Sequence, residues 1–215
     1  MEVVMNIITK IEVGKRNKER VNIFINDEFA FSVSAEIVYK ENLKVKQEID
    51  IDSLKKIVNE DNYIKCKNSA LKIIERTHKS EKEIRDKLVL KDYENHIIDK
   101  TINFLKEYNF LNDSNYAKMY VRDKSKTQGQ MKIKYTLKQK GIDESLIEKE
   151  LSMIDNNELK DVAIDLALRK YKTLCKREND KYKLKQKLYR FLMGKGYEYS
   201  LISEVIKIVV NDELI

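Results

Sequence analysis

The order of hydrophobic and polar residues divides the chain into two parts with different periods. Up to about residue 58 the pattern is that of strands: apolar or β-branched residues occupy alternate positions over 7–13, and two apolar-rich runs, 21–25 and 28–33, flank Asn26-Asp27. Alternation is typical of a half-buried strand, and Asn-Asp tolerates the backbone conformation of a tight hairpin turn. The pattern predicts a strand followed by a hairpin.

Two shorter elements complete this N-terminal segment. The pattern predicts a short amphipathic helix over 35–40 and a last strand over 45–49. We therefore expect residues 1–58 to form a small β-containing segment. Its ten basic and ten acidic residues cancel, so the formal net charge of +7 belongs to the rest of the chain.

From residue 59 onward the spacing of apolar residues is helical, and the same arrangement occurs three times without a gap. Apolar or aromatic residues stand at offsets 0, 4, 9, 13, 14, 18 and 21 from the first position of each copy. The three copies are Ile84, Leu88, Tyr93, Ile97, Ile98, Ile102 and Leu105; Ile133, Leu137, Ile142, Leu146, Ile147, Leu151 and Ile154; and Leu188, Leu192, Tyr197, Leu201, Ile202, Ile206 and Val209. An internal repeat of this kind predicts three similar helical units.

Each copy contains a helix break at the same place. Gly141 and Gly196 stand directly before offset 9, where the end of a helix needs a left-handed residue, and Asp92 takes this place in the first copy. Ser80 with Glu83 has the spacing of a capping box and predicts a helix start. The break therefore separates two helices in every copy.

A further apolar helix precedes each of these helix pairs, so every unit has three helices. These preceding helices are centred on 70–74, 117–121 and 163–167. We assign the three units to residues 59–112, 113–155 and 156–215. Units of this size have small cores, so neighbours should stack on one another. The predicted fold is mainly α: tandem three-helix, helix-turn-helix-like repeats in an elongated curved array, with the small β-containing segment at the N-terminus.

Composition supports a helical, folded chain. Of its 215 residues 42% are hydrophobic and 37% are charged, and it has five glycines and no proline. This excludes a disordered tail and argues against an all-β fold. Cys66 and Cys175 are far apart and lack the neighbouring ligands of a zinc site, so we expect them to be reduced rather than disulfide-bonded. With no long apolar run and no secretory signal in Met1–Lys10, we expect a cytoplasmic protein without a membrane span.

Signatures of catalysis are absent from the sequence. His78 and His96, the two histidines, lie in polar surroundings that favour ordinary surface positions over a general base or a metal ligand. Gly194-Lys-Gly196 is too short for a phosphate-binding loop and is explained by helix termination. We therefore predict a protein that is not an enzyme and that uses no cofactor and no metal.

Positive charge is concentrated in two stretches. Residues 118–140 carry eight basic side chains against Asp123 alone, and residues 169–195 carry eleven against Glu178 and Asp180. Each stretch covers the end of a first helix, the linker and the second helix of a repeat, with tyrosines interleaved. One interpretation is a set of solvated helix faces; the other, which we favour, is a surface for nucleic acid or for an acidic nucleoprotein.

The charge pattern argues against reading of a DNA groove by these units. In a helix-turn-helix the recognition helix enters the major groove, but here the third helices are rich in acidic residues that would repel phosphates. They carry Glu94, Asp99, Glu144, Glu148, Glu150, Glu198 and Glu204. Contacts with DNA should instead come from the second helices and linkers, with little sequence reading.

Several motifs taken together resemble the RecX family of regulators of the RecA recombinase. They are the run Lys79-Ser-Glu-Lys-Glu-Ile-Arg-Asp-Lys-Leu88, then Phe110-Leu-Asn-Asp-Ser-Asn-Tyr-Ala117, Lys140-Gly-Ile142 and Gly194-Lys-Gly-Tyr197. Ile8-Thr-Lys-Ile11 with Arg20-Val-Asn-Ile-Phe-Ile25 looks like the N-terminal extension of members from Gram-positive bacteria. The resemblance covers nearly the whole chain.

The resemblance implies a non-enzymatic protein that binds the RecA filament on single-stranded DNA and inhibits its ATPase, strand-exchange and co-protease activities, in DNA repair and SOS control. We expect a monomer with weak, non-sequence-specific contacts to DNA phosphates. A helix-turn-helix transcription regulator is the alternative, and a purely structural adaptor is a third hypothesis. The candidate contacts with protein or DNA are Lys124, Lys126, Lys132, Lys134, Lys138, Lys140, Arg177, Lys183, Lys187 and Arg190.

Overall fold

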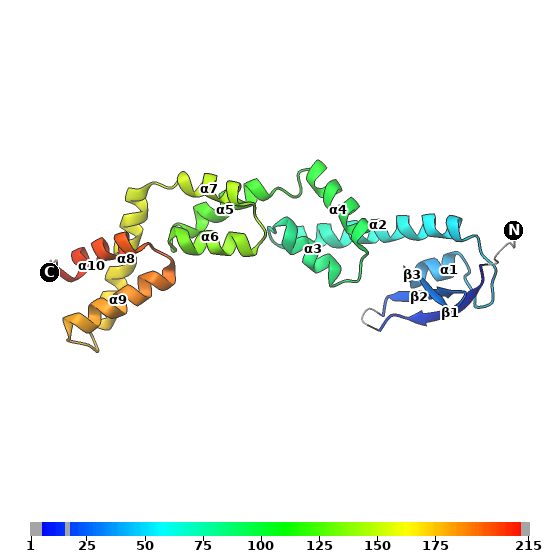
Figure 1. The fold of residues 1–215 in the computed structure, drawn as a ribbon, viewed down its shortest axis with the longest axis horizontal. Helices are drawn as coiled ribbons and strands as arrows, with labels where there is room; N and C mark the ends of the chain where they lie inside the picture. The colour runs from blue at the N-terminus through cyan, green and yellow to red at the C-terminus, as the bar shows by residue number, and fades with distance from the viewer. Residues whose placement is uncertain (1–5, 16–17, 212–215) are drawn as a thin grey trace. The chain divides into compact units, whose positions relative to one another are not determined.

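The computed structural model describes residues 6–15 and 18–211 (Figure 1). Residues 1–5, 16–17 and 212–215 lie outside the description, and with them the first half of the Met1–Lys10 stretch in which we expect no secretory signal. The described part is mainly helical, with a small three-stranded sheet near its beginning. The chain divides into two compact units, Met1–Leu111 and Asn112–Ile215.

The first unit begins with an antiparallel sheet of strand order β1-β2-β3. β1 spans Ile8–Val13, β2 spans Arg20–Ile25 and β3 spans Glu28–Ser34. Asn26 and Asp27 join β2 to β3 with φ angles of 49° and 67°, the left-handed conformation that a tight hairpin turn needs. The predicted strand and hairpin are therefore confirmed.

The helix predicted after the hairpin is confirmed, whereas the strand predicted over 45–49 is wrong. α1 spans Ala35–Lys40, and the Ser34 hydroxyl at its start accepts a hydrogen bond from the amide of Ile37. Over 45–49 the chain forms a turn in which Lys46 has a φ of 72°, and among the described residues of this run Glu48 alone forms a β-bridge, with Ile7. A strand needs a negative φ at every position, so the turn interrupts the pairing.

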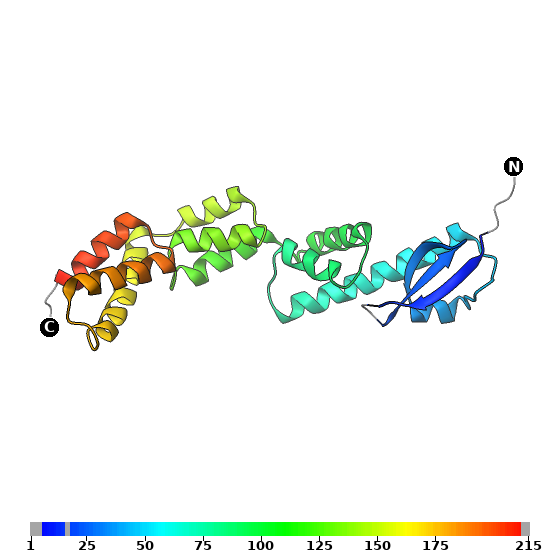
Figure 2. The same cartoon turned by 60° about the horizontal axis from the view of Figure 1, so that its bottom comes forward.

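α2, which spans Ile51–Arg76, is shared between the sheet and the first group of helices. Leu54 and Val58 in its first half are buried in the core of the sheet, while Cys66 and Ala70 in its second half are buried against α3 and α4. Figure 2 shows the sheet lying against the first half of this helix. One continuous helix thus passes through position 58, where the hydrophobic period changes. The four-part division of the chain remains a prediction.

Three groups of three helices follow, which we call the first, second and third modules. The first consists of the second half of α2 with α3 (Glu81–Val89) and α4 (Asn95–Glu107); the second of α5 (Asp113–Lys124), α6 (Gln130–Gln139) and α7 (Glu144–Ser152); the third of α8 (Asn156–Leu174), α9 (Lys181–Lys195) and α10 (Tyr199–Asn211). Every one of the repeat positions lies in the hydrophobic core of its own module. The internal repeat is confirmed.

The predicted helix start at Ser80 and the predicted breaks before the third helices are confirmed. Ser80 and Glu83 form a complete capping box at the start of α3. The break before the third helix of each module has a left-handed residue: Asp92 with φ 61°, Gly141 with φ 77° and Gly196 with φ 86°. These breaks turn the chain so that the apolar faces of the flanking helices meet.

Candidate functional site

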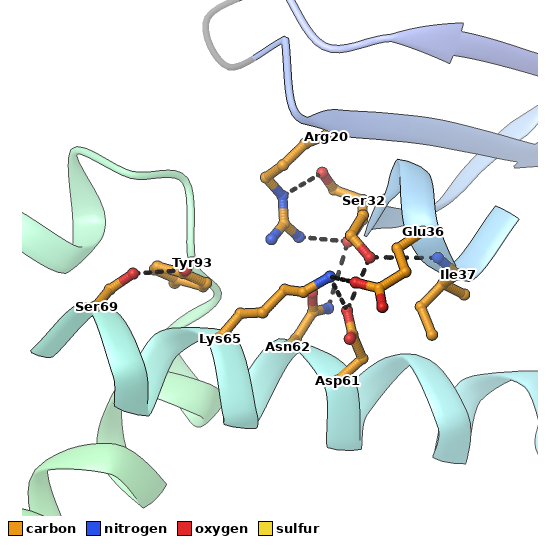
Figure 3. A network of polar contacts seen from close by, with 10 residues as sticks. Arg20, Ser32, Glu36, Ile37, Asp61, Asn62, Lys65, Ser69 and Tyr93 are labelled. Carbon is orange, nitrogen blue, oxygen red and sulfur yellow. Dashed lines mark hydrogen bonds and ion pairs between the residues drawn. The ribbon is translucent and has the colours of Figure 1, made fainter. Parts of the chain in front are cut away.

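A buried arginine lies where the sheet meets α2. Arg20 is 7% exposed; its Nε donates to the Ser32 hydroxyl over 2.9 Å, and its Nη2 donates to the Ser32 carbonyl. That carbonyl also accepts from the Asn62 side chain on α2 over 3.3 Å. Figure 3 shows how these groups bring β2, β3 and α2 together. The arginine forms no ion pair with a described residue, so its charge is held by neutral acceptors and by an aromatic ring.

That ring belongs to the loop between α3 and α4. The Arg20 guanidinium lies 5.6 Å from the ring centroid of Tyr93, and the Tyr93 hydroxyl lies 3.1 Å from the Ser69 hydroxyl on α2 (Figure 3). Burial raises the pKa of Tyr93 above its ordinary value of 10.0. A guanidinium on an aromatic face is a favourable contact when both are shielded from water. Arg20 therefore connects the N-terminal sheet to the first module.

Ion pairs extend the same contact along α2. Lys65 lies 3.2 Å from both Asp61 on α2 and Glu36 on α1, and Asp61 also accepts from the Ser34 hydroxyl over 3.1 Å. Figure 3 shows these side chains on the face of α2 that meets α1 and the sheet. The N-terminal segment is thus fastened to the first module through its polar residues as well as its core.

The second and third modules are joined through their backbones. The Gly129 amide donates to the Lys195 carbonyl over 2.9 Å, and the Met131 amide donates to the Gly196 carbonyl over 3.1 Å. Unpaired amides at the start of α6 thus satisfy carbonyls at the end of α9, which pairs the positive end of one helix with the negative end of the other. We call this contact the module junction.

Two glycines make the module junction possible. A Cβ on Gly129 would lie 2.5 Å from the amide nitrogen of Tyr197 and closer still to the Gly196 carbonyl, and a Cβ on Gly196 would meet the backbone of Lys132. Lys132 itself donates from Nζ to the Gly194 carbonyl over 3.3 Å. One of the predicted contact residues therefore already has a partner within the chain.

The basic second helix of the second module is paired with the acidic third helix beside it. Lys134 on α6 lies 3.0 Å from Glu148 and 3.1 Å from Glu144 on α7, and Lys138 lies 2.6 Å from Glu144. The hydrogen bonds to Glu148 and Glu144 raise the pKa of Lys134, and those from Lys138 and Lys134 lower the pKa of Glu144. The charge of this face is lower than the count of lysines on α6 indicates.

In the third module the paired acids come from the linker before α9. Lys187 lies 2.9 Å from Glu178, and this contact lowers the pKa of the Glu178 carboxyl. Lys183 lies 3.9 Å from Asp180, the residue whose carboxylate caps α9. The Lys183–Asp180 pair is exposed, and an exposed pair contributes little to stability, whereas Glu178 in the other pair is half-buried.

The remaining predicted contact residues fall into two groups. Lys124 pairs with Asp123 over 2.9 Å, and Lys140 lies 5.6 Å from the ring centroid of Tyr116. Lys126, Arg177 and Arg190 are exposed, and none of the three forms an ion pair with a described residue. The structure thus leaves these three cations open to a partner and ties the others to acidic, aromatic or carbonyl groups.

Across residues 6–15 and 18–211, no group of three His, Cys, Asp or Glu side chains is arranged to hold a metal ion. Within the same ranges, no helix combines the length and the apolar character needed to cross a membrane. Cys66 and Cys175 are both free, and burial raises the pKa of the Cys66 thiol.

Comparison with known proteins identifies the family of the chain. Four family models match it in order: the regulatory protein RecX N-terminal domain over residues 6–50, and the first, second and third three-helix domains of RecX over 66–105, 112–151 and 158–206. "Regulatory protein RecX" of Clostridium beijerinckii is 53% identical over 94% of this chain and 95% of its own length. The chain belongs to the RecX family.

Other members of the RecX family show similarity of the same extent. "Regulatory protein RecX" of Clostridium perfringens strain 13 is 49% identical over 97% of this chain and 99% of its own length. A crystal structure of regulatory protein RecX covers 97% of this chain and 100% of its own, with 26% identity and a TM-score of 0.64. The structure of RecX from Lactobacillus salivarius covers 69% of this chain and 97% of its own, with 29% identity and a TM-score of 0.61. Both Clostridium relatives and the first of these structures are named regulatory proteins and not enzymes.

The resemblance to the RecX family that the sequence motifs indicated is therefore confirmed. Sequence reasoning missed the roles of Arg20 and Gly129. Arg20 lies within a motif of that resemblance, but nothing local shows that its side chain turns inward from β2. Gly129 directly precedes α6, and Gly196 directly follows α9. Glycines at these two helix ends were the one signal in the sequence that the two backbones approach each other closely.

Proposed function

We propose that the chain is a non-enzymatic regulator that binds the RecA recombinase filament on single-stranded DNA and inhibits its ATPase, strand-exchange and co-protease activities. In this role it would act in the cytoplasm, as a monomer, in DNA repair and in control of the SOS response. Membership of the RecX family supports the proposal. The observation that carries it is a set of exposed cations in the basic stretches 118–140 and 169–195 that form no ion pair with a described residue: Lys126, Arg177 and Arg190.

A repeated cationic surface suits a polymer. A filament on DNA presents the same acidic groups at regular intervals, so modules in series can each contribute a weak contact. Once one module is bound, the next binds at a high effective concentration, and overall affinity rises without any strong single contact. The module junction fixes two such modules to one another through backbone hydrogen bonds.

Inhibition would follow from a difference in affinity between filament states. A ligand shifts a conformational equilibrium only by as much as it prefers one state over the other. A chain whose modules fit the spacing of one filament geometry would therefore favour that geometry and oppose the changes that ATP hydrolysis and strand exchange require.

The structure supports this function over that of a helix-turn-helix transcription regulator. A recognition helix has to bring donors to the DNA groove, but α7 holds Glu144 and Glu148 beside the lysines of α6, and α10 holds Glu204 at 2.8 Å from Lys160. Third helices that carry glutamates paired with lysines of neighbouring helices present no excess of positive charge to the phosphates on both sides of a groove.

The test is the recombinase ATPase on single-stranded DNA, measured with substoichiometric amounts of this chain. We expect inhibition, and we expect the variant Lys126→Gln/Arg177→Gln/Arg190→Gln to inhibit at least several-fold less well, because each removed cation weakens attraction to a polyanion. The matched control removes three exposed cations of the N-terminal part, Lys40, Lys55 and Lys56, and should inhibit as the unchanged chain does.

Two results would contradict the proposal. An intact filament whose ATPase is unaffected by the chain would exclude inhibition. Sequence-specific binding to duplex DNA without any effect on the recombinase would favour the transcription regulator instead.

A further inference from the structure

A basic cleft lies in the first module, away from the two stretches in which the sequence concentrates positive charge. It has a volume of about 710 Å³ and is lined by five cations, Lys72, Arg76, Lys79, Lys87 and Lys91, with Glu19 as the one acidic residue among its lining groups. The cations come from the end of α2, from the α2–α3 linker, from the end of α3 and, in the case of Lys91, from the turn that follows α3. Two helix ends thus direct their positive side chains at one hollow.

Four of these cations form no ion pair within the described part of the chain. Lys79 lies 3.5 Å from Glu83, but Lys72, Arg76, Lys87 and Lys91 are exposed and form no ion pair with any residue that the structure describes. In the second module, by contrast, Lys134 and Lys138 on α6 are paired with glutamates of α7. The four cations of the cleft therefore lack the carboxylate partners that Lys134 and Lys138 have in the second module.

Local helix stability does not account for this arrangement. Lys72 and Arg76 are like charges four residues apart on α2, a spacing that destabilises a helix, and Lys87 at the end of α3 is followed by Lys91 in the next turn. The helix dipole favours one cation in each last turn, which explains Arg76 and Lys87 but not Lys72 one turn earlier. The repulsion would be relieved by a bound polyanion.

An aromatic surface adjoins the cleft on the other side of α2. Lys72 also lines a second hollow, with Leu71, Ile74 and Phe110. Phe110 is 50% exposed and stacks on Tyr108, which is 60% exposed, with ring centroids 6.5 Å apart and an interplanar angle of 18°. Cations beside exposed aromatic rings form the usual surface for single-stranded nucleic acid, in which phosphates meet the cations and bases stack on the rings.

We propose that this cleft binds the phosphates of a single nucleic-acid strand and that Tyr108 and Phe110 stack on its bases. The inference rests on the proposed function in that it assigns to the first module a DNA contact within the filament complex. An acidic protein segment would satisfy the cations but would leave the stacked rings without a planar partner, so the nucleic-acid strand is the better fit.

The experiment measures fluorescence anisotropy of a labelled oligodeoxythymidine, without recombinase, as salt is raised from 50 mM. The variant Lys72→Gln/Arg76→Gln/Lys87→Gln/Lys91→Gln should bind at least about tenfold more weakly at low salt, and the slope of log K against log salt should become shallower by about 0.7 for each phosphate that the variant no longer neutralises. Tyr108→Leu/Phe110→Leu should weaken binding about tenfold with an unchanged salt dependence, because stacking releases no counterions.

Matched controls lie on the same helix. Lys55 and Lys56 are exposed residues of α2 that form no ion pair with a described residue, so Lys55→Gln/Lys56→Gln removes the same charge as Lys72→Gln/Arg76→Gln. The first pair should leave oligonucleotide affinity unchanged, and the second should lower it.

Three outcomes would overturn the inference. The unchanged chain does not bind the oligonucleotide, or Lys55→Gln/Lys56→Gln weakens oligonucleotide binding as much as Lys72→Gln/Arg76→Gln does. The third outcome is a cleft variant that no longer binds polyglutamate but still binds the oligonucleotide. The last outcome would assign the cleft to an acidic protein. The ATPase assay separates this inference from the proposed function, since a chain that binds DNA through the cleft and leaves the recombinase unaffected would refute the proposed function alone.

Discussion

The module junction gives the sharpest test of how the second and third modules are held together. Gly129 has a φ of −79° and a ψ of 164°, a conformation that alanine adopts without strain. The backbone conformation at Gly129 therefore does not by itself require glycine. The third module excludes a side chain at this position, because the new Cβ would meet the Gly196 carbonyl and the Tyr197 amide.

The cost of Gly129→Ala can be worked out from the hydrogen bonds that have to open. The two backbones have to move apart, which breaks the hydrogen bonds from Gly129 to Lys195, from Met131 to Gly196 and from Lys132 to Gly194. With about 1 kcal/mol for each hydrogen bond, the junction should lose about 2–3 kcal/mol. The cores of the two modules stay intact, so the loss should be confined to the junction.

Amide hydrogen exchange of the full chain, followed by NMR, measures this directly. The Met131 amide should be protected in the unchanged chain and should exchange about 30-fold faster or more in Gly129→Ala, as expected for about 2 kcal/mol. Two controls separate the causes. Gly129→Ser improves the N-cap but adds the same Cβ, so it should be as disruptive as alanine. Gly194→Ala has open space around its Cβ and should stabilise α9 by about 0.5–1 kcal/mol.

Unchanged protection of Met131 in Gly129→Ala would refute the reasoning, because it would show that the close approach of the two backbones is not present in solution. Rescue by serine would also refute it, since the loss would then come from the helix cap and not from the junction.

Three further predictions concern substitutions of individual side chains or of one pair of side chains. Burial raises the pKa of Tyr197 to about 12 from 10.0. The free energy of unfolding should therefore keep its full value below pH 10 and fall by about 2–3 kcal/mol as the pH rises to 12. Alkaline unfolding of Tyr197→Phe, compared with that of the unchanged chain, should lack this loss. Arg20→Lys should destabilise the first unit by about 2 kcal/mol in urea unfolding, because lysine cannot make both bonds to Ser32, and a change below about 0.5 kcal/mol would show that the bonds are dispensable. Glu144→Gln with Glu148→Gln should free the α6 lysines and lower the concentration needed for half-inhibition of the recombinase ATPase several-fold; weaker inhibition would show that these lysines do not contact the filament.

Much of the local structure could be predicted from the sequence. The repeat positions around Ile84, Ile133 and Leu188 are buried or half-buried in their cores as predicted, because a helix that has to bury one face repeats its apolar residues with the period of the helix. The hairpin at Asn26-Asp27 and the capping box at Ser80 are equally local, since the residues that form them are neighbours in the chain. The prediction of a strand over 45–49 is wrong because the pattern of apolar residues does not show that Lys46 adopts a left-handed turn conformation.

The candidate site shows where sequence reasoning ends. Counting charges in windows located the basic flanks of the second and third modules, but it overestimated their charge, because Glu144 and Glu148 fold back onto Lys134. Counting charges in windows also missed the cleft in the first module, because the cations that line it are separated along the chain by acidic residues. Only the folded helices bring Lys72 and Lys91 to the same hollow.

The sequence by itself determined the helices, their ends and the threefold repeat, because these depend on residues within a few turns of one another. The tertiary structure decided which charges neutralise each other, which remain open to a partner, and how Gly129 and Gly196 join two modules. The physical reason is that ion pairing and close backbone approach depend on distances of a few ångströms between residues far apart in the chain, and such distances exist only once the helices have packed.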